Sequence, residues 1–136
     1  MAGIDDVREI ALSLPGVEER IGGHTGEAVW RAKNGQFVWI RGPRQTDLRQ
    51  LADLDRVWPA GPVLGIRVFN LAEKEAMLAA EPDALFTIPH FDGYPAVLLR
   101  LDAIDRERLK ELVCDAWLLR APVTVARAWL DERGFA

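Results

Sequence analysis

The sequence is poor in cysteine, histidine and tyrosine, and it has no long hydrophobic run. Its 136 residues include one cysteine, two histidines and one tyrosine. The single cysteine, Cys114, cannot form an internal disulfide, which excludes a disulfide-stapled secreted fold. No apolar run reaches the ~18 residues that a membrane span needs, and the opening MAGIDDVREI has acids where a signal peptide has a basic start. We therefore expect a cytoplasmic protein without membrane contact.

The chain does contain enough apolar material for one hydrophobic core. Hydrophobic residues make up 49% of it and charged residues 28%. These fractions are typical of a soluble globular protein and argue against disorder of the whole chain. The length lies within the usual range of one domain. We expect a single domain over residues 1–136, monomeric and without a cofactor.

The charge balance is acidic but uneven along the chain. The formal net charge of -4 argues against a protein whose whole surface attracts nucleic acid, because phosphate affinity is built mainly from lysine and arginine. Residues 20–50 nevertheless hold six basic residues against two acidic ones. This asymmetry is typical either of a binding face on an acidic body or of ordinary solvated surface.

Apolar periodicity and helix-capping residues predict the helices. Asn70 and Asp105 are suited to cap helices, since their side chains can accept the free N–H groups of a first turn. The helix after Asp105 has an apolar stripe at helical spacing, formed by Leu109, Leu112, Val113, Ala116 and Trp117. The other helices are expected over residues 4–14, 46–56, 71–81 and 122–132.

Two turn dipeptides predict β-hairpins. Asn34-Gly35 accepts the backbone angles of a type I′ turn between strands 26–32 and 35–41. In that register Trp30 faces Trp39 and Ala32 faces Phe37, so these four side chains form the apolar side of the hairpin.

Asp92-Gly93 is the second such signal, with Phe91 opposite Tyr94. Further strands are expected over residues 63–69, 84–88 and 96–101. The predicted fold class is α+β, an antiparallel sheet with two projecting β-hairpins and helices packed on one side.

The segment FTIPHFDGYP, residues 86–95, holds the candidate catalytic groups. His90 has no serine or cysteine nucleophile and no second acid near it, so Asp92 is interpreted as a turn residue. His24 would have to join His90 and Asp92 to hold a metal, and the short ligand spacing of a metal motif is missing. Cys114 lies next to Asp115 and not next to a basic group that would activate a thiolate. We expect no enzyme and no metal site.

The glycine-rich stretch from Gly22 to Gly26 is interpreted as a connector. Phosphate-binding loops require a preceding strand and a lysine after the final glycine. We predict no strand before this stretch, and Glu27 follows it.

Three stretches carry a family resemblance: VREIALSLPGVEE, FTIPHFDGYP and LDAIDRERLKELVCDAWLLRAP. Together they resemble the MmcQ/YjbR family, small bacterial proteins with a fold similar to that of CyaY, over nearly the whole chain. The resemblance implies an α+β domain whose two hairpins are likened to a double-wing DNA-binding surface. The chain departs from the family pattern at Glu27, where relatives tend to carry a lysine, and this removes a charge from the first hairpin.

Two functions from different classes follow. In the first, the protein binds nucleic acid, with phosphate contacts near the first hairpin and backbone or groove contacts at the second; the residues are Arg31, Lys33, Arg41, Arg44, His90 and Tyr94. Such contacts position a protein without reading sequence, so binding would be weak and salt-sensitive. In the second, an exposed Trp58 segment and the acidic C-terminal helices meet a protein partner. An enzyme would require a pocket that joins His24, His90 and Asp92.

Overall fold

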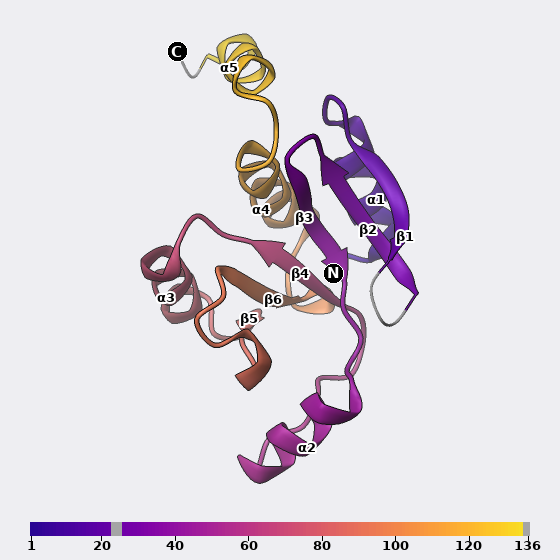
Figure 1. Cartoon of the computed structure of the whole chain (residues 1–136), viewed down its shortest axis with the longest axis vertical. Coiled ribbons are helices and arrows are strands. Elements are labelled where there is room, and N and C mark those ends of the chain that lie inside the picture. The colour runs from indigo at the N-terminus through magenta and orange to yellow at the C-terminus, as the bar shows by residue number, and fades with distance from the viewer. Residues whose placement is uncertain (23–25, 135–136) are drawn as a thin grey trace.

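One six-stranded antiparallel sheet organises the chain (Figure 1). The computed structural model describes residues 1–22 and 26–134, and no helix in these ranges is long and apolar enough to cross a membrane. The strand order is β1-β2-β3-β4-β6-β5. In chain order the elements are α1 (Ile4–Ser13), β1 (Glu18–Gly22), β2 (Glu27–Ala32), β3 (Gly35–Ile40), α2 (Gln45–Asp53), β4 (Val63–Arg67), α3 (Leu71–Ala80), β5 (Leu85–Phe86), η1 (Pro89–Phe91), β6 (Ala96–Arg100), η2 (Leu101–Ala103), α4 (Arg106–Leu118) and α5 (Val123–Glu132). The predicted α+β class is confirmed.

The helices begin where the capping residues predicted. The Asn70 side chain accepts the N–H of Glu73 at 2.8 Å, and the Asp105 side chain accepts that of Arg108 at 2.9 Å. Each cap satisfies one of the N–H groups that a first helical turn leaves free. The predicted apolar stripe of α4 is buried along its length.

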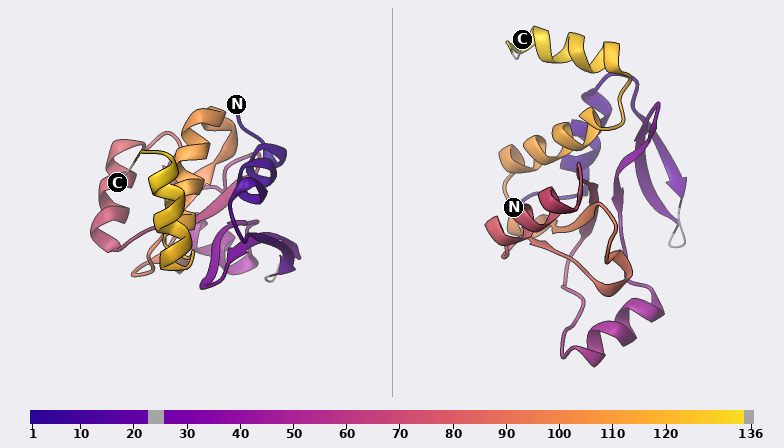
Figure 2. Two further views of the ribbon diagram at one scale, coloured as in Figure 1. Left: turned by 90° about the horizontal axis from the view of Figure 1, so that it is seen from above. Right: turned by 60° about the vertical axis from the view of Figure 1, so that its left-hand side comes forward.

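Hydrophobic clusters lie on both faces of the sheet. α1 and α4 pack side by side on one face (Figure 2), over a core that includes Trp30 and Trp117. The other face has a smaller cluster, in which Leu51 of α2 and Phe91 of η1 pack with Trp39. α2 therefore departs from the expectation that the helices gather on one side.

Strand β1 was not predicted. It pairs along its whole length with β2, and its residues Glu18 to Ile21 are exposed. A strand without a buried side has no alternation of apolar and polar residues, so its sequence carries no strand signal. The expectation that no strand precedes the glycine-rich stretch was wrong, although residues 23–25 of that stretch lie outside the described ranges.

The first predicted hairpin is present, but its register differs. Ala32 pairs with Gly35, so the turn lies one residue earlier than Asn34-Gly35. The N–H of Asn34 donates to the carbonyl of Arg120 at 3.0 Å. The segment between α4 and α5 therefore holds this turn, and a contact distant in sequence overrides the local preference for a type I′ turn.

A β-bulge in β3 sends Trp39 to the opposite face from Trp30. The pairing passes from Gln36 to Val38 within one step of β2, which leaves Phe37 as the extra residue. Phe37 packs in the larger cluster, whereas Trp39 packs in the smaller one. The prediction that Trp30 and Trp39 share a face was therefore wrong.

The second predicted hairpin has a turn at Asp92-Gly93, but this turn does not join its two strands directly. β5 and β6 pair antiparallel, but η1 and a four-residue turn lie between them. Asp92 has φ -60° and ψ 129°, Gly93 has φ 73°, and the N–H of Tyr94 donates to the carbonyl of Phe91 at 3.0 Å. These angles define a type II turn, so Phe91 and Tyr94 are corner residues and not opposed strand residues.

Trp39 packs against Gly65 of β4 and leaves no room for a side chain at this position. A Cβ on Gly65 would lie 2.2 Å from Cε2 of the indole. We predict that Gly65→Ala displaces the indole and lowers the free energy of unfolding by about 1–3 kcal/mol, measured by urea denaturation.

Gly22→Ala is the matched control, because its Cβ would lie 3.6 Å from a Val29 methyl group, an ordinary contact. We expect this control to change stability by less than about 0.5 kcal/mol. Equal stabilities of the two variants would contradict the packing of Trp39 on Gly65.

Candidate functional site

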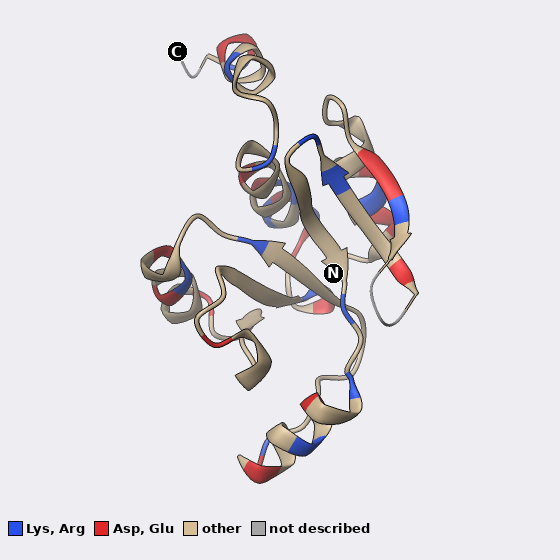
Figure 3. Cartoon of the chain, in the orientation of Figure 1, with Lys and Arg blue, Asp and Glu red and all other residues tan. Residues whose placement is uncertain are grey.

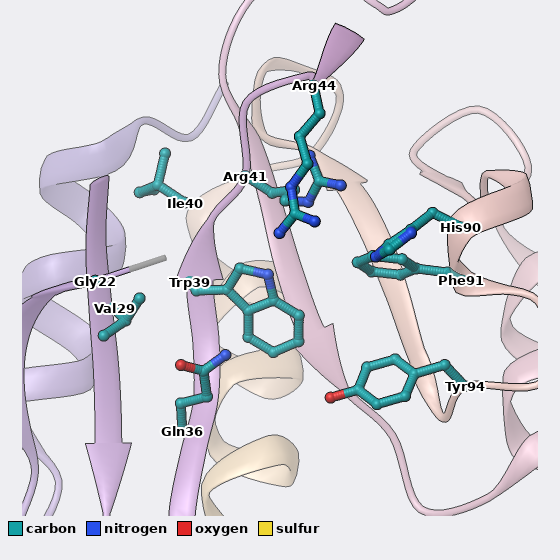
Figure 4. Close-up of a pocket in the computed structure, with 10 residues that line it drawn as sticks. All are labelled: Gly22, Val29, Gln36, Trp39, Ile40, Arg41, Arg44, His90, Phe91 and Tyr94. Carbon is teal, nitrogen blue, oxygen red and sulfur yellow. The ribbon is translucent and has the colours of Figure 1, made fainter. Parts of the chain in front are cut away.

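A pocket of about 270 Å³ opens on the sheet face that α1 and α4 leave free (Figure 4). Its walls come from the first three strands, the residues that follow β3 and the segment 90–94. The lining consists of Gly22, Val29, Gln36, Trp39, Ile40, Arg41, Arg44, His90, Phe91 and Tyr94. Four of the six predicted contact residues thus lie in one pocket: Arg41, Arg44, His90 and Tyr94.

Arg41 is a buried part of the pocket wall. Its side chain is 6% exposed, and Nη2 lies 2.8 Å from Oδ2 of Asp47, whose side chain is 1% exposed. Its Nη1 donates to the carbonyl of Gly42. The guanidinium carbon also lies 5.6 Å from the ring centroid of Phe91 and 5.9 Å from that of Trp58. Arg41 is therefore a structural cation and not an exposed phosphate contact.

Arg44 supplies a second guanidinium group, and its side chain reaches into the pocket beside that of Arg41 (Figure 4). Its backbone N–H donates to Oδ2 of Asp47 at 2.9 Å, so one carboxylate holds both residues. Its Nε is buried and has no hydrogen-bond partner among the described residues. Two guanidinium groups with one carboxylate leave this end of the pocket positively charged.

Lys74 holds the segment that forms the opposite wall. Its Nζ donates to the carbonyls of Phe91 at 2.6 Å and Tyr94 at 2.9 Å from a buried position in α3. Burial lowers the pKa of the Lys74 ammonium below its ordinary value, and the negative charge of Asp92 offsets part of this effect. The sequence carried no signal for this role, because a lysine in a helix usually faces solvent.

Tyr94 presents an aromatic ring at this wall. The ring lies 5.7 Å from that of Phe91 in an edge-to-face arrangement. Arg67 of β4 donates to the Tyr94 hydroxyl at 2.9 Å, and its guanidinium carbon lies 5.1 Å from the ring centroid. The contacts with Phe91 and Arg67 fix the orientation of the ring, while 41% of the residue stays exposed. Arg67 was another site residue that the sequence analysis did not identify.

The other predicted contact residues lie at the rim of the pocket or beyond it. His90 is an exposed lining residue. Arg31 pairs with Gln36 near the tip of the β2–β3 hairpin, and Lys33 is exposed in the turn. Figure 3 shows that the basic residues of this tip and those before α2 lie toward opposite ends of β3. The predicted contacts that are lysine or arginine therefore form two groups, one near each end of β3.

Three alternative sites have different surroundings. Trp58 is half-buried and packs edge-on against Phe86, 5.9 Å between ring centroids, so the protein-interaction hypothesis depends on its exposed neighbours Leu54 and Val57 and stays a prediction. Burial raises the pKa of the Cys114 thiol, which disfavours the nucleophilic thiolate. His24 lies outside the described residues.

Comparisons with known proteins agree with this architecture. A sequence model of the YjbR family matches residues 12–119. Proteins of Mycobacterium tuberculosis and Mycobacterium bovis, each named only as an uncharacterized protein, are 40% identical over 134 residues, which cover 98% of this chain and the whole of theirs. The crystal structure of a Deinococcus radiodurans protein with a DUF419 domain has a TM-score of 0.62 at 21% identity, over 88% of this chain and 78% of that one. The predicted family and fold are thus confirmed.

Removal of the Asp47 charge tests the buried ion pair. Asp47→Asn leaves the buried guanidinium of Arg41 without a counter-charge, so we expect a loss of about 3–5 kcal/mol in the free energy of unfolding, measured by chemical denaturation. Asp53→Asn, at an exposed position of the same helix, is the control. Similar small effects of both changes would contradict the pairing.

Lys74→Met tests whether the buried ammonium of Lys74 holds the segment that forms the pocket wall. It leaves two carbonyls without their donor, and we expect a loss of about 1–3 kcal/mol at neutral pH. Because the folded-state pKa lies below the ordinary 10.5, the unfolded chain binds more protons between these two values. The stability of the wild-type protein therefore rises across this interval as the pH increases, and the Met variant lacks the rise.

The measurement is chemical denaturation at a series of alkaline pH values, with Lys110→Met on the exposed side of α4 as the control. The difference between wild-type protein and Lys74→Met should grow with pH. A difference that stays constant would show that Lys74 is solvated.

Proposed function

This chain belongs to the YjbR family, and we propose that it is a non-catalytic protein that binds nucleic acid weakly through the open face of its sheet. The supporting observation is the lining of the pocket, which includes the guanidinium groups of Arg41 and Arg44 and the imidazole of His90 but, among the residues that the structure describes, no acidic residue. A lining of this kind favours an anion, and phosphate is the anion that a nucleic acid presents along its whole length.

The surface around the pocket adds further basic groups. Arg31 shares the pocket side of β2 with Val29, and Arg67 lies beside Tyr94. Acidic groups on the same side weaken the attraction for phosphate, although Glu18 forms an ion pair with Arg20 at 2.6 Å. With a net charge of -4 for the chain, the excess of basic groups is local. Binding is therefore weak and falls steeply with salt, as expected when phosphate contacts dominate.

The β2–β3 hairpin is the element suited to contact a duplex. Arg31 and Lys33 lie at or near its tip, where their long side chains can reach phosphates without a conformational change. Arg44, His90 and Tyr94 extend this contact surface toward the pocket. Arg41 acts indirectly, because its buried ion pair with Asp47 positions the chain before α2.

Titration of a labelled duplex with wild-type protein and the double variant Arg31→Ala plus Lys33→Ala tests this function. We expect binding at about 50 mM salt that weakens strongly by about 200 mM. Each lost phosphate contact reduces the slope of log affinity against log salt by about 1, so the double variant should bind more weakly and with a flatter slope.

The control is Lys110→Ala plus Arg127→Ala, which removes the same charges from exposed positions on α4 and α5. It should leave both the affinity and the salt slope near those of the wild-type protein. Absence of duplex binding at low salt, or equal losses in the two double variants, would count decisively against the proposal.

A further inference from the structure

We infer that the pocket binds a single unpaired nucleotide, with its phosphate at the Arg44 end and its base against the aromatic wall that ends at Tyr94. The inference rests on the proposed function and deepens it, because it specifies the part of a nucleic acid that enters the pocket. Its argument uses the hydrogen-bond donors, the aromatic rings and the size of the pocket.

One end of the pocket has a buried guanidinium donor that lacks an acceptor among the described residues. Nε of Arg44 is buried without a hydrogen-bond partner among the described residues. Nη2 of Arg41 already has a partner, Oδ2 of Asp47 at 2.8 Å, so Arg41 contributes its charge to this end of the pocket but no free donor. Figure 4 shows the Nε1 edge of Trp39 turned toward the same space. Buried donors without acceptors favour an anionic oxygen ligand.

The other wall is built for a flat apolar group. Tyr94 lies across the pocket from Trp39 with its hydroxyl end toward the space (Figure 4), and the buried ring of Phe91 lies beside it in an edge-to-face arrangement, 5.7 Å between ring centroids. Arg67 fixes the Tyr94 ring through its hydroxyl, so little side-chain freedom is lost when a base stacks on it. Stacking of bases on aromatic side chains is a common mode of recognition of single strands.

The size of the pocket favours one nucleotide over a base pair. At about 270 Å³ the cavity lies just below the usual range of ~300–1,000 Å³ for small-molecule pockets. It has room for one ring system and a phosphate, whereas a paired base would bring its partner with it. A nucleotide within a duplex must therefore leave the stack before it can enter, and an unpaired one need not.

The test compares a single-stranded oligothymidylate of about ten nucleotides with a duplex of equal length, at one salt concentration, against wild-type protein, Tyr94→Leu and Arg44→Gln. We expect the single strand to bind at least about tenfold more tightly than the duplex. Tyr94→Leu removes the stacking ring and should weaken single-strand binding by about 5- to 100-fold, a loss at least about fivefold greater than its effect on duplex binding. Thermal unfolding of both variants verifies that they fold.

Competition by small ligands measures the separate contributions of the phosphate and the base. It also distinguishes a nucleotide within a strand from a free nucleotide. Thymidine 5′-monophosphate should displace the strand, and neither thymidine nor inorganic phosphate alone should match it. Arg44→Gln should reduce competition by the monophosphate and leave that by thymidine unchanged. Equal competition by inorganic phosphate would reduce the pocket to a plain anion site and overturn the inference.

The outcomes distinguish this inference from the proposed function. If strand and duplex bind equally and Tyr94→Leu changes neither, the inference fails while nucleic-acid binding stands. If only the free monophosphate binds, and both variants lose it, the pocket assignment is supported and nucleic-acid binding is overturned. If no ligand binds, both fail.

Discussion

The packing of the Trp39 indole on Gly65 is the contact on which the candidate site depends. The bulge at Phe37 turns Trp39 to the face that α1 and α4 leave free, and the missing side chain at Gly65 lets the indole lie flat across β4. A residue with a Cβ there would lift the indole and close the space in front of it. A bulge in one strand and a glycine in the next thus jointly create the floor of the pocket, and neither feature would do so alone.

The charge of the pocket is maintained by groups that no ligand would touch. Asp47 accepts the backbone N–H of Arg44 and lies against the guanidinium of Arg41, so it positions two basic residues with one negative charge. Lys74 positions the opposite wall, because its ammonium donates hydrogen bonds to the backbone carbonyls of Phe91 and Tyr94. Buried ions are costly unless they are paired and hydrogen-bonded, so their use here indicates that the geometry of the two walls is strongly specified.

Local signals predicted the helices, and the remaining features depended on contacts distant in sequence. Asn70 and Asp105 cap their helices as expected, because a capping side chain needs only the next three residues. The register at Asn34 was wrong because Arg120 supplies its acceptor. Arg44, His90 and Tyr94 were predicted as contact residues, but the pocket that joins them has walls far apart in the chain. Lys74 and Arg67 had no signal, since only the folded segment 91–94 gives them partners.

The two edge strands of the sheet limit how it can associate. β5 is only two residues long, and β1 presents the charged sequence Glu18, Glu19 and Arg20 along its exposed length. Short strands and charged side chains both discourage the addition of a strand from another molecule. The sheet lacks a full helical layer on one face. Its two edges nevertheless disfavour extension of the sheet by strands of another molecule.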